Sequence, residues 1–178
     1  MRKVILYELL SLDGVAEAPE TFFIDWDDAM DAALAAVIET QDSVILGRRS
    51  YDEWSQFWPG SEIEPFATFI NQVPKYVATS TPLEGHWSNS SAIEGDLVPF
   101  VQELKSSSGG DVGVHASISV AQALLAARVI DEVRLVVAPA IVGHGRRLLE
   151  GLPPIRLDLL RSATSPSGYL LADYSVSR

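Results

Sequence analysis

The chain has 178 residues, of which 47% are hydrophobic and 21% are charged. These values are ordinary for a globular protein, so wholesale disorder is excluded, and the length fits a single domain over residues 1–178. The 24 acidic and 13 basic residues give a formal net charge of −11, which disfavours general binding to nucleic acid or to an anionic membrane. The absence of cysteine excludes disulfides, thiolate nucleophiles and cysteine-based metal sites.

The amino terminus, residues 1–6, begins with a basic pair and apolar residues, as a signal peptide does. Glu8 and Asp13 interrupt the apolar stretch and no cleavage site of small residues follows, so we predict a first strand instead. No apolar run approaches the ~18 residues of a membrane span. We therefore expect a cytoplasmic protein that does not enter a membrane.

The first half of the chain alternates apolar runs of strand length with segments of helical period, which is typical of an α/β protein. Asp25 is the expected N-cap of the first helix, and Pro59 is expected to end the second. The predicted order is strand 4–10, helix 26–40, strand 43–46 and helix 48–57.

The second half continues this alternation and then changes to a hairpin. A Ser-Pro-Ser-Gly turn separates the last two strand segments, which predicts that they are antiparallel. We therefore predict a mixed sheet, mostly parallel, with an antiparallel edge. The expected elements are strands 75–79, 90–93, 111–115 and 132–139, helix 96–105, a helix beginning after Ser117, and the hairpin 155–163 with 168–176.

The junction after strand 43–46 has residues suited to binding an anion. Gly47 leads directly into a helix start that carries Arg48, Arg49 and Ser50. The free N–H groups and the positive end of a helix attract an anion, and arginine adds bidentate contacts to phosphate. The alternative is that both arginines merely solvate the end of a helix.

Two further strand ends repeat this pattern with small or hydroxyl residues. For the later of the two, Ser117 as an ordinary N-cap explains the sequence equally well. Because ligands collect at the carboxyl ends of parallel strands, we expect all three ends to converge on one phosphate-bearing ligand. The residues concerned are Thr79 and Ser80 at one end, and Ala116, Ser117, Ile118 and Ser119 at the other.

Six motifs, taken in order, resemble the dihydrofolate reductase superfamily, and specifically the branch related to the C-terminal reductase domain of bacterial riboflavin biosynthesis. They are SLDGV (11–15), VILGRRSY (44–51), PKYVATS (74–80), VHAS (114–117), VIDEVRL (129–135) and PAIVGHGRRLL (139–149). Together they span most of the chain. The resemblance implies a dihydrofolate reductase-like three-layer α/β fold and a reductase that uses NADPH.

The resemblance also implies roles for the junction residues. Gly47, Arg48, Arg49 and Ser50 would contact the 2′-phosphate and pyrophosphate of the cofactor, Thr79 and Ser80 its adenosine end, and Ala116, Ser117, Ile118 and Ser119 its pyrophosphate. The loop of Ser11, Asp13, Gly14 and Val15 would cover the nicotinamide and the substrate. This family usually has glycine where this chain has Ala116, and a methyl group there would weaken binding if φ were positive.

Hydride transfer to C=N or C=O also needs a proton for the receiving atom. Alignment on Gly47 and Arg48 places Asp31 where dihydrofolate reductases have the carboxylate that orients their substrate. Asp13 and Glu8 are alternatives to Asp31. Asp31 is otherwise an ordinary first-turn acid, favourable to the helix dipole.

We predict an NADPH-dependent oxidoreductase that reduces a small heterocyclic or conjugated C=N or C=O substrate, with Asp31 or Asp13 assisting protonation and with no metal. The alternative is a non-catalytic nucleotide- or ligand-binding protein on the same scaffold, an interpretation that Ala116 keeps open. A homodimer formed through an apolar edge such as residues 133–138 is compatible with either function.

Overall fold

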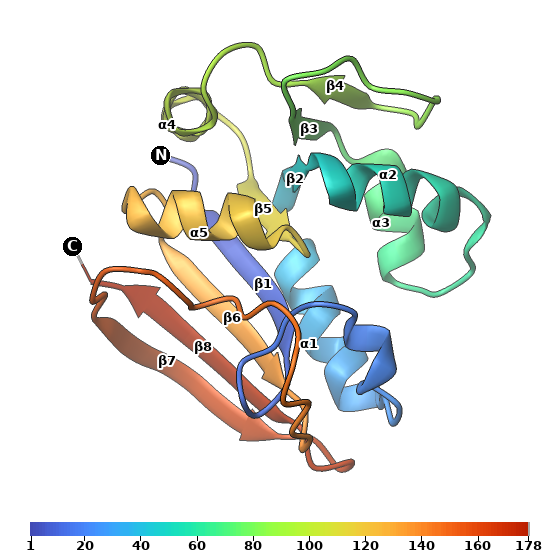
Figure 1. Cartoon of the computed structure of the whole chain (residues 1–178), viewed down its shortest axis with the longest axis vertical. Coiled ribbons are helices and arrows are strands. Elements are labelled where there is room, and N and C mark those ends of the chain that lie inside the picture. Colours follow the sequence, from blue (N-terminus) through green and yellow to red (C-terminus); the bar gives the residue numbers. More distant parts are fainter. Residues whose placement is uncertain (178) are drawn as a thin grey trace.

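The computed structural model describes residues 1–177, and a mixed sheet of eight strands runs through its centre (Figure 1). The order across the sheet is β4-β3-β2-β5-β1-β6-β8-β7. Neighbours from β4 to β6 are parallel, whereas β8 is antiparallel to both β6 and β7. The strands are β1 (Val4–Leu10), β2 (Gln41–Gly47), β3 (Lys75–Ala78), β4 (Ser90–Ala92), β5 (Asp111–His115), β6 (Glu132–Val137), β7 (Leu157–Thr164) and β8 (Leu170–Val176).

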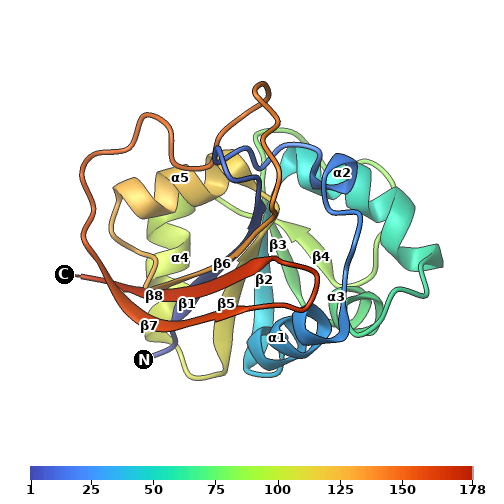
Figure 2. The same cartoon turned by 90° about the horizontal axis from the view of Figure 1, so that it is seen from below.

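Helices cover both faces of the sheet and complete three layers (Figure 2). α1 and α3 pack on one face, and α4 and α5 pack on the other. The helices are α1 (Asp28–Ile38), α2 (Arg48–Phe57), α3 (Phe66–Gln72), α4 (Leu97–Ser106) and α5 (Ile118–Ala126), with short 3-10 turns η1 (Pro19–Thr21) and η2 (Trp58–Gly60). The predicted fold class, a mostly parallel α/β sheet closed by an antiparallel hairpin, is confirmed.

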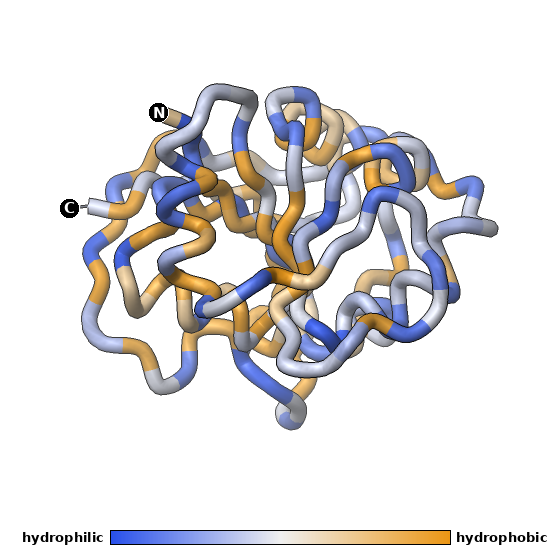
Figure 3. The backbone as a smooth tube through the Cα atoms, turned by 90° about the horizontal axis from the view of Figure 1, so that it is seen from above, coloured by the Kyte–Doolittle hydropathy of each residue, from blue (hydrophilic) through white to orange (hydrophobic). Residues whose placement is uncertain are grey.

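The strand β1 supplies side chains to two separate cores because it is buried on both faces. Ile5 and Tyr7 pack against α1 and α3, while Val4 and Leu6 pack against α4 and α5. Hydrophobic stretches accordingly follow the central strands, and many outer loops are hydrophilic (Figure 3). Within residues 1–177, no helix is long and apolar enough to cross a membrane.

Two sequence predictions about elements are wrong. The N-cap of α1 is Asp27, whose carboxylate accepts from the N–H groups of Ala29 and Met30, because Asp25 is still in an extended segment where its own N–H donates to Tyr169. The segment 133–138 is also not an edge, since β6 is paired to β1 on one side and to β8 on the other. A second copy therefore cannot pair with that segment as an edge strand, and a homodimer stays a prediction.

The helix α3 is missing from the predicted elements. Its seven residues span barely two turns, and Pro65 precedes it directly. A helix this short carries too little apolar period to be distinguished from a loop.

Replacing Leu124 by alanine should lower the free energy of unfolding by about 3 kcal/mol. This side chain of α5 is fully buried in the core between the sheet and the helices α4 and α5. The matched control is Leu160→Ala on β7, where the residue is 54% exposed and the expected loss is below about 0.5 kcal/mol. Urea unfolding measures both, and equal losses would contradict this assignment of the core.

Candidate functional site

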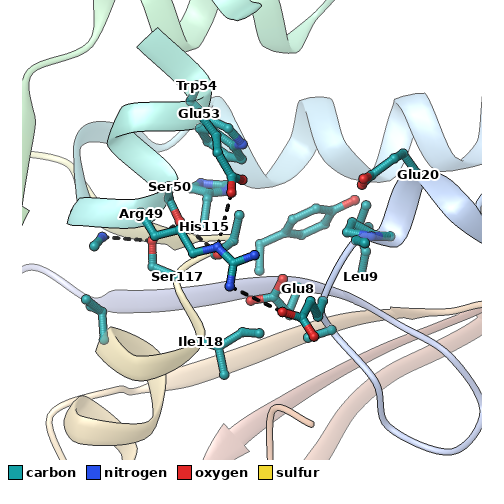
Figure 4. A pocket seen from close by; sticks show the side chains of 18 of the residues that line it. Glu8, Leu9, Glu20, Arg49, Ser50, Glu53, Trp54, His115, Ser117 and Ile118 are labelled. Atoms are coloured by element: carbon teal, nitrogen blue, oxygen red, sulfur yellow. Dashed lines mark hydrogen bonds and ion pairs between the residues drawn. The ribbon is translucent and has the colours of Figure 1, made fainter. Parts of the chain in front are cut away.

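A cavity of about 770 Å³ opens at the carboxyl ends of the parallel strands. Gly47, Ala78 and His115, the last residues of β2, β3 and β5, line it together with residues near the end of β1. Figure 4 shows the start of α2, the β5–α5 junction and Glu8 of β1 around this space. The volume is within the range of small-molecule and cofactor sites.

Hydroxyl groups tie the start of α2 to the start of α5. The Gly47 N–H donates to Ser117 Oγ at 2.9 Å, and Ser117 Oγ donates to Ser50 Oγ at 3.1 Å. Ser50 Oγ in turn donates to the carbonyl of Ala116 at 3.0 Å. Ser117 stands at the N-cap position but makes no side-chain bond to its own helix, so the interpretation as an ordinary N-cap is wrong.

The starts of α2 and α5 are both open toward the cavity. Gly47, the N-cap of α2, has no side chain, and Ser117 is engaged elsewhere, so among residues 1–177 neither N-cap residue caps its helix with a side chain. The positive ends of the two helix dipoles therefore face one region. Such a region attracts phosphate or another anion.

Three arginines line the same part of the cavity and are held in place by neighbours. The Arg48 guanidinium donates to Asp52 at 2.8 Å, to Thr81 Oγ1 at 2.6 Å and to Thr79 Oγ1 at 3.3 Å. It is therefore not merely a solvated helix end. The exposed Arg49 pairs with Glu53 and Glu17, and Arg146 donates to Ser119 Oγ at 2.8 Å.

The predicted residues after β1 lie outside the cavity. The Asp13 carboxylate accepts from Ser11 Oγ at 2.7 Å and from the N–H groups of Val142 and Gly143 at 3.0 and 2.8 Å. These hydrogen bonds, first the one from Ser11, hold the pKa of Asp13 well below its usual value. Asp13 thus anchors the loop after β6, and the cavity lining includes neither Asp13 nor Ser11, Gly14 or Val15.

The other predicted residues divide between the cavity and its rim. Asp31 lines the cavity from α1, and its Oδ1 accepts from Trp26 Nε1 at 2.6 Å. Thr79 and Ser80 do not line it, although Thr79 contacts Arg48. The structure brings together the following predicted residues: Asp31, Gly47, Arg48, Arg49, Ser50, Ala116, Ser117, Ile118 and Ser119.

The family model of the RibD C-terminal domain matches residues 2–171. The chain belongs to this family. It is 25% identical over 179 residues to the uncharacterized protein YyaP of Bacillus subtilis (strain 168), covering 97% of this chain and 94% of YyaP. It is 28% identical over 155 residues to the uncharacterized protein YwjB of the same organism, covering 85% of this chain and 84% of YwjB.

Solved structures share the fold of this RibD C-terminal domain. A Shewanella sp. PV-4 protein assigned to riboflavin biosynthesis aligns with a TM-score of 0.79 and 18% identity, covering 99% of both chains. A diaminohydroxyphosphoribosylaminopyrimidine deaminase/5-amino-6-(5-phosphoribosylamino)uracil reductase from Thermotoga maritima aligns with a TM-score of 0.70 and 15% identity. That alignment covers 99% of this chain and 57% of the Thermotoga chain. The fold is dihydrofolate reductase-like, as the motifs predicted.

Ala116, like Ala18, is a cavity residue of this RibD C-terminal domain with a positive φ. It lines the cavity with φ of 49°, in the left-handed region that glycine adopts without strain. Its carbonyl is held by Ser50, so the hydroxyl bridge maintains a backbone conformation that disfavours alanine.

Glu8 lines the cavity, although the sequence indicates it only as an alternative to Asp31. It is 3% exposed, and its Oε2 has no hydrogen-bond partner within residues 1–177. Burial raises the pKa of Glu8 to about 8, so its carboxyl group is mostly protonated at neutral pH. In the sequence, the feature that distinguishes Glu8 is its position as the single acidic residue of the apolar strand VILYELL.

His115, beside Glu8 in the cavity lining, is a neutral residue. Burial lowers the pKa of His115 to about 3, and its Nε2 lies 2.8 Å from Gln41 Oε1. Within residues 1–177, no group of metal-ligating side chains is suited to hold a metal ion.

Replacing Ala116 by glycine should raise the free energy of unfolding by about 0.5–1 kcal/mol, because relief of the left-handed strain exceeds the added flexibility of the unfolded chain. The control is Ala123→Gly at an exposed position within α5, where the free energy of unfolding should fall by about 1 kcal/mol. The midpoints of urea unfolding show whether the two variants change stability in opposite directions. A loss in both variants would contradict the conformation at residue 116.

Replacing Glu8 by glutamine should change how stability depends on pH. The folded protein keeps a proton up to about pH 8 that the unfolded chain releases near 4.5. The stability that protonated Glu8 contributes is complete below about pH 4.5 and is lost as the pH rises toward 8. The unfolding free energy of Glu8→Gln minus that of the wild type should therefore rise across this interval and level off above it. Urea unfolding at several pH values measures this difference, and a constant difference would contradict the burial of Glu8.

Proposed function

We propose that the chain is an NADPH-dependent reductase that transfers a hydride to a C=N or C=O bond of a small heterocyclic substrate. The observation that carries the proposal is the pair of open helix starts, α2 and α5, joined by hydroxyl groups and flanked by arginines at one end of a large cavity. This donor set has the chemistry that phosphate groups require.

The residues present fit the cofactor. Arg48 and Arg49, with the open start of α2, would hold phosphates of NADPH, and Ser119 and Arg146 would act at the start of α5. The cavity keeps its volume of about 770 Å³ with the Ala116 methyl group in place, so that methyl group does not fill it. NADPH, when bound, supplies the hydride.

Two of the three carboxyl groups that the sequence offered for the substrate line the cavity. They are Asp31 on α1 and Glu8 on β1, whereas Asp13 is committed to the loop after β6. We assign the orientation of the substrate and the supply of its proton to Asp31 and Glu8. The name of the Thermotoga maritima protein, a reductase of a substituted uracil, supports a heterocyclic substrate for this chain.

A thermal shift experiment with NADPH tests the proposal. At an NADPH concentration 100 times the Kd, binding adds about 2.7 kcal/mol of stability and visibly raises the Tm. We expect Arg48→Ala to weaken binding by at least about tenfold, because the charged contacts to phosphate are lost. Arg156→Ala is the matched control, since that side chain is 84% exposed and does not line the cavity.

The outcomes of this experiment test the cofactor site on which the proposal depends. A shift with NADPH that Arg156→Ala retains and Arg48→Ala loses supports the cofactor site, and oxidation of bound NADPH by a substrate then separates a reductase from a non-catalytic nucleotide-binding protein. The absence of a shift with NADPH would contradict the proposal and favour a non-catalytic ligand-binding protein.

A further inference from the structure

The side of the cavity opposite the arginines is aromatic and acidic. Trp26, α1, η1, the second half of α2 and the segment 58–66 form this side, and within residues 1–177 it has no basic lining residue. The three basic lining residues, Arg48, Arg49 and Arg146, lie by the starts of α2 and α5. Glu17 and Glu53 also line the cavity there and pair with Arg49. The acidic and aromatic residues of the opposite side are Glu20, Asp31, Glu64, Trp26, Trp54, Trp58 and Phe66.

Glu8 lies where these two sides meet. In Figure 4 it projects from β1 into the space between Arg49 and Glu20. Its side chain is almost wholly buried, and within the described residues neither an ion pair nor a hydrogen bond satisfies Oε2. A buried carboxyl oxygen without a partner is costly, and an N–H group of a ligand would satisfy it.

We propose that the molecule reduced here is a planar heterocycle without a phosphate group, which presents an N–H edge to Glu8. This inference rests on the reductase function proposed above. Flat rings suit the walls formed by Trp26, Trp54 and Trp58. The N–H edge matches the unsatisfied oxygen of Glu8, and the carboxylate of Asp31 lies on the same acidic side.

The exclusion of phosphate follows from the distribution of charge. The cofactor would occupy the arginines and the two helix starts, which are the features of this cavity that attract anions. A phosphate on the substrate would then lie among Glu20, Asp31 and Glu64 without a cation. Like charges in such a site oppose binding and thereby select against phosphorylated molecules.

Binding to the NADPH-saturated protein tests this inference by calorimetry. The probes are 2-aminobenzimidazole, a planar heterocycle with an N–H edge, and uridine 5′-monophosphate, which adds a sugar phosphate to such a ring. We expect the first to bind and the second not to bind. Glu8→Leu, which removes both carboxyl oxygens, should weaken the binding of 2-aminobenzimidazole by at least about tenfold, and Glu103→Leu at an exposed position on α4 should leave it unchanged.

The outcomes distinguish this inference from the reductase function. Uridine 5′-monophosphate binding as tightly as 2-aminobenzimidazole, or equal binding of 2-aminobenzimidazole by wild type and Glu8→Leu, would overturn the inference while NADPH binding still stands. No binding of 2-aminobenzimidazole would overturn it as well. Failure of NADPH itself to bind would instead overturn the proposed function, and 2-aminobenzimidazole titrated into the free protein would still test the role of Glu8.

Discussion

One side chain, the hydroxyl of Ser117, joins the two helix starts that line the cavity. It accepts from the N–H of Gly47 and donates to Ser50, which joins two segments 70 residues apart in the sequence. Because this hydroxyl holds α2, it does not cap α5, and the first-turn N–H groups of both helices stay open. The same bridge reaches the carbonyl of Ala116 through Ser50 and holds a left-handed backbone. The anchoring of the two helix starts and the left-handed backbone at Ala116 therefore share one chain of hydrogen bonds.

The distribution of charge around the cavity matters more than the net charge of the protein. A chain with a formal charge of −11 repels anions in general, and only a local cluster of cations and helix dipoles can overcome this. Arg48, Arg49 and Arg146 form that cluster at one end, where Glu17 and Glu53 pair with Arg49, while the other acidic residues and the aromatic residues occupy the other end. The cavity is thus divided into a part suited to a phosphorylated cofactor and a part suited to an uncharged or cationic ring. Glu8 lies at the boundary, where hydride and proton would meet.

Much of the fold could be predicted because the strands of a buried parallel sheet are continuous apolar runs, as in β1 and β6. The order of the strands across the sheet could not be predicted from these runs. The sequence therefore predicts β6 at an edge, whereas the hairpin β7–β8 pairs with its free side. The glycine and arginines at the start of α2 marked the anion-binding end in the sequence. The partners of Ser117 and Asp13, however, lie far away in the chain and depend on tertiary packing. Glu8 was visible as an acid in an apolar strand, but its missing partner was not.

The most direct test of this account is an NMR titration of the isotope-labelled protein with NADPH. The account predicts that the largest changes in chemical shift occur in the backbone amides of the first turns of α2 and α5, including Arg49, Ser50 and Ser119, with none along β7. No change on addition of NADPH, or changes concentrated on the β7–β8 hairpin, would contradict the cofactor site.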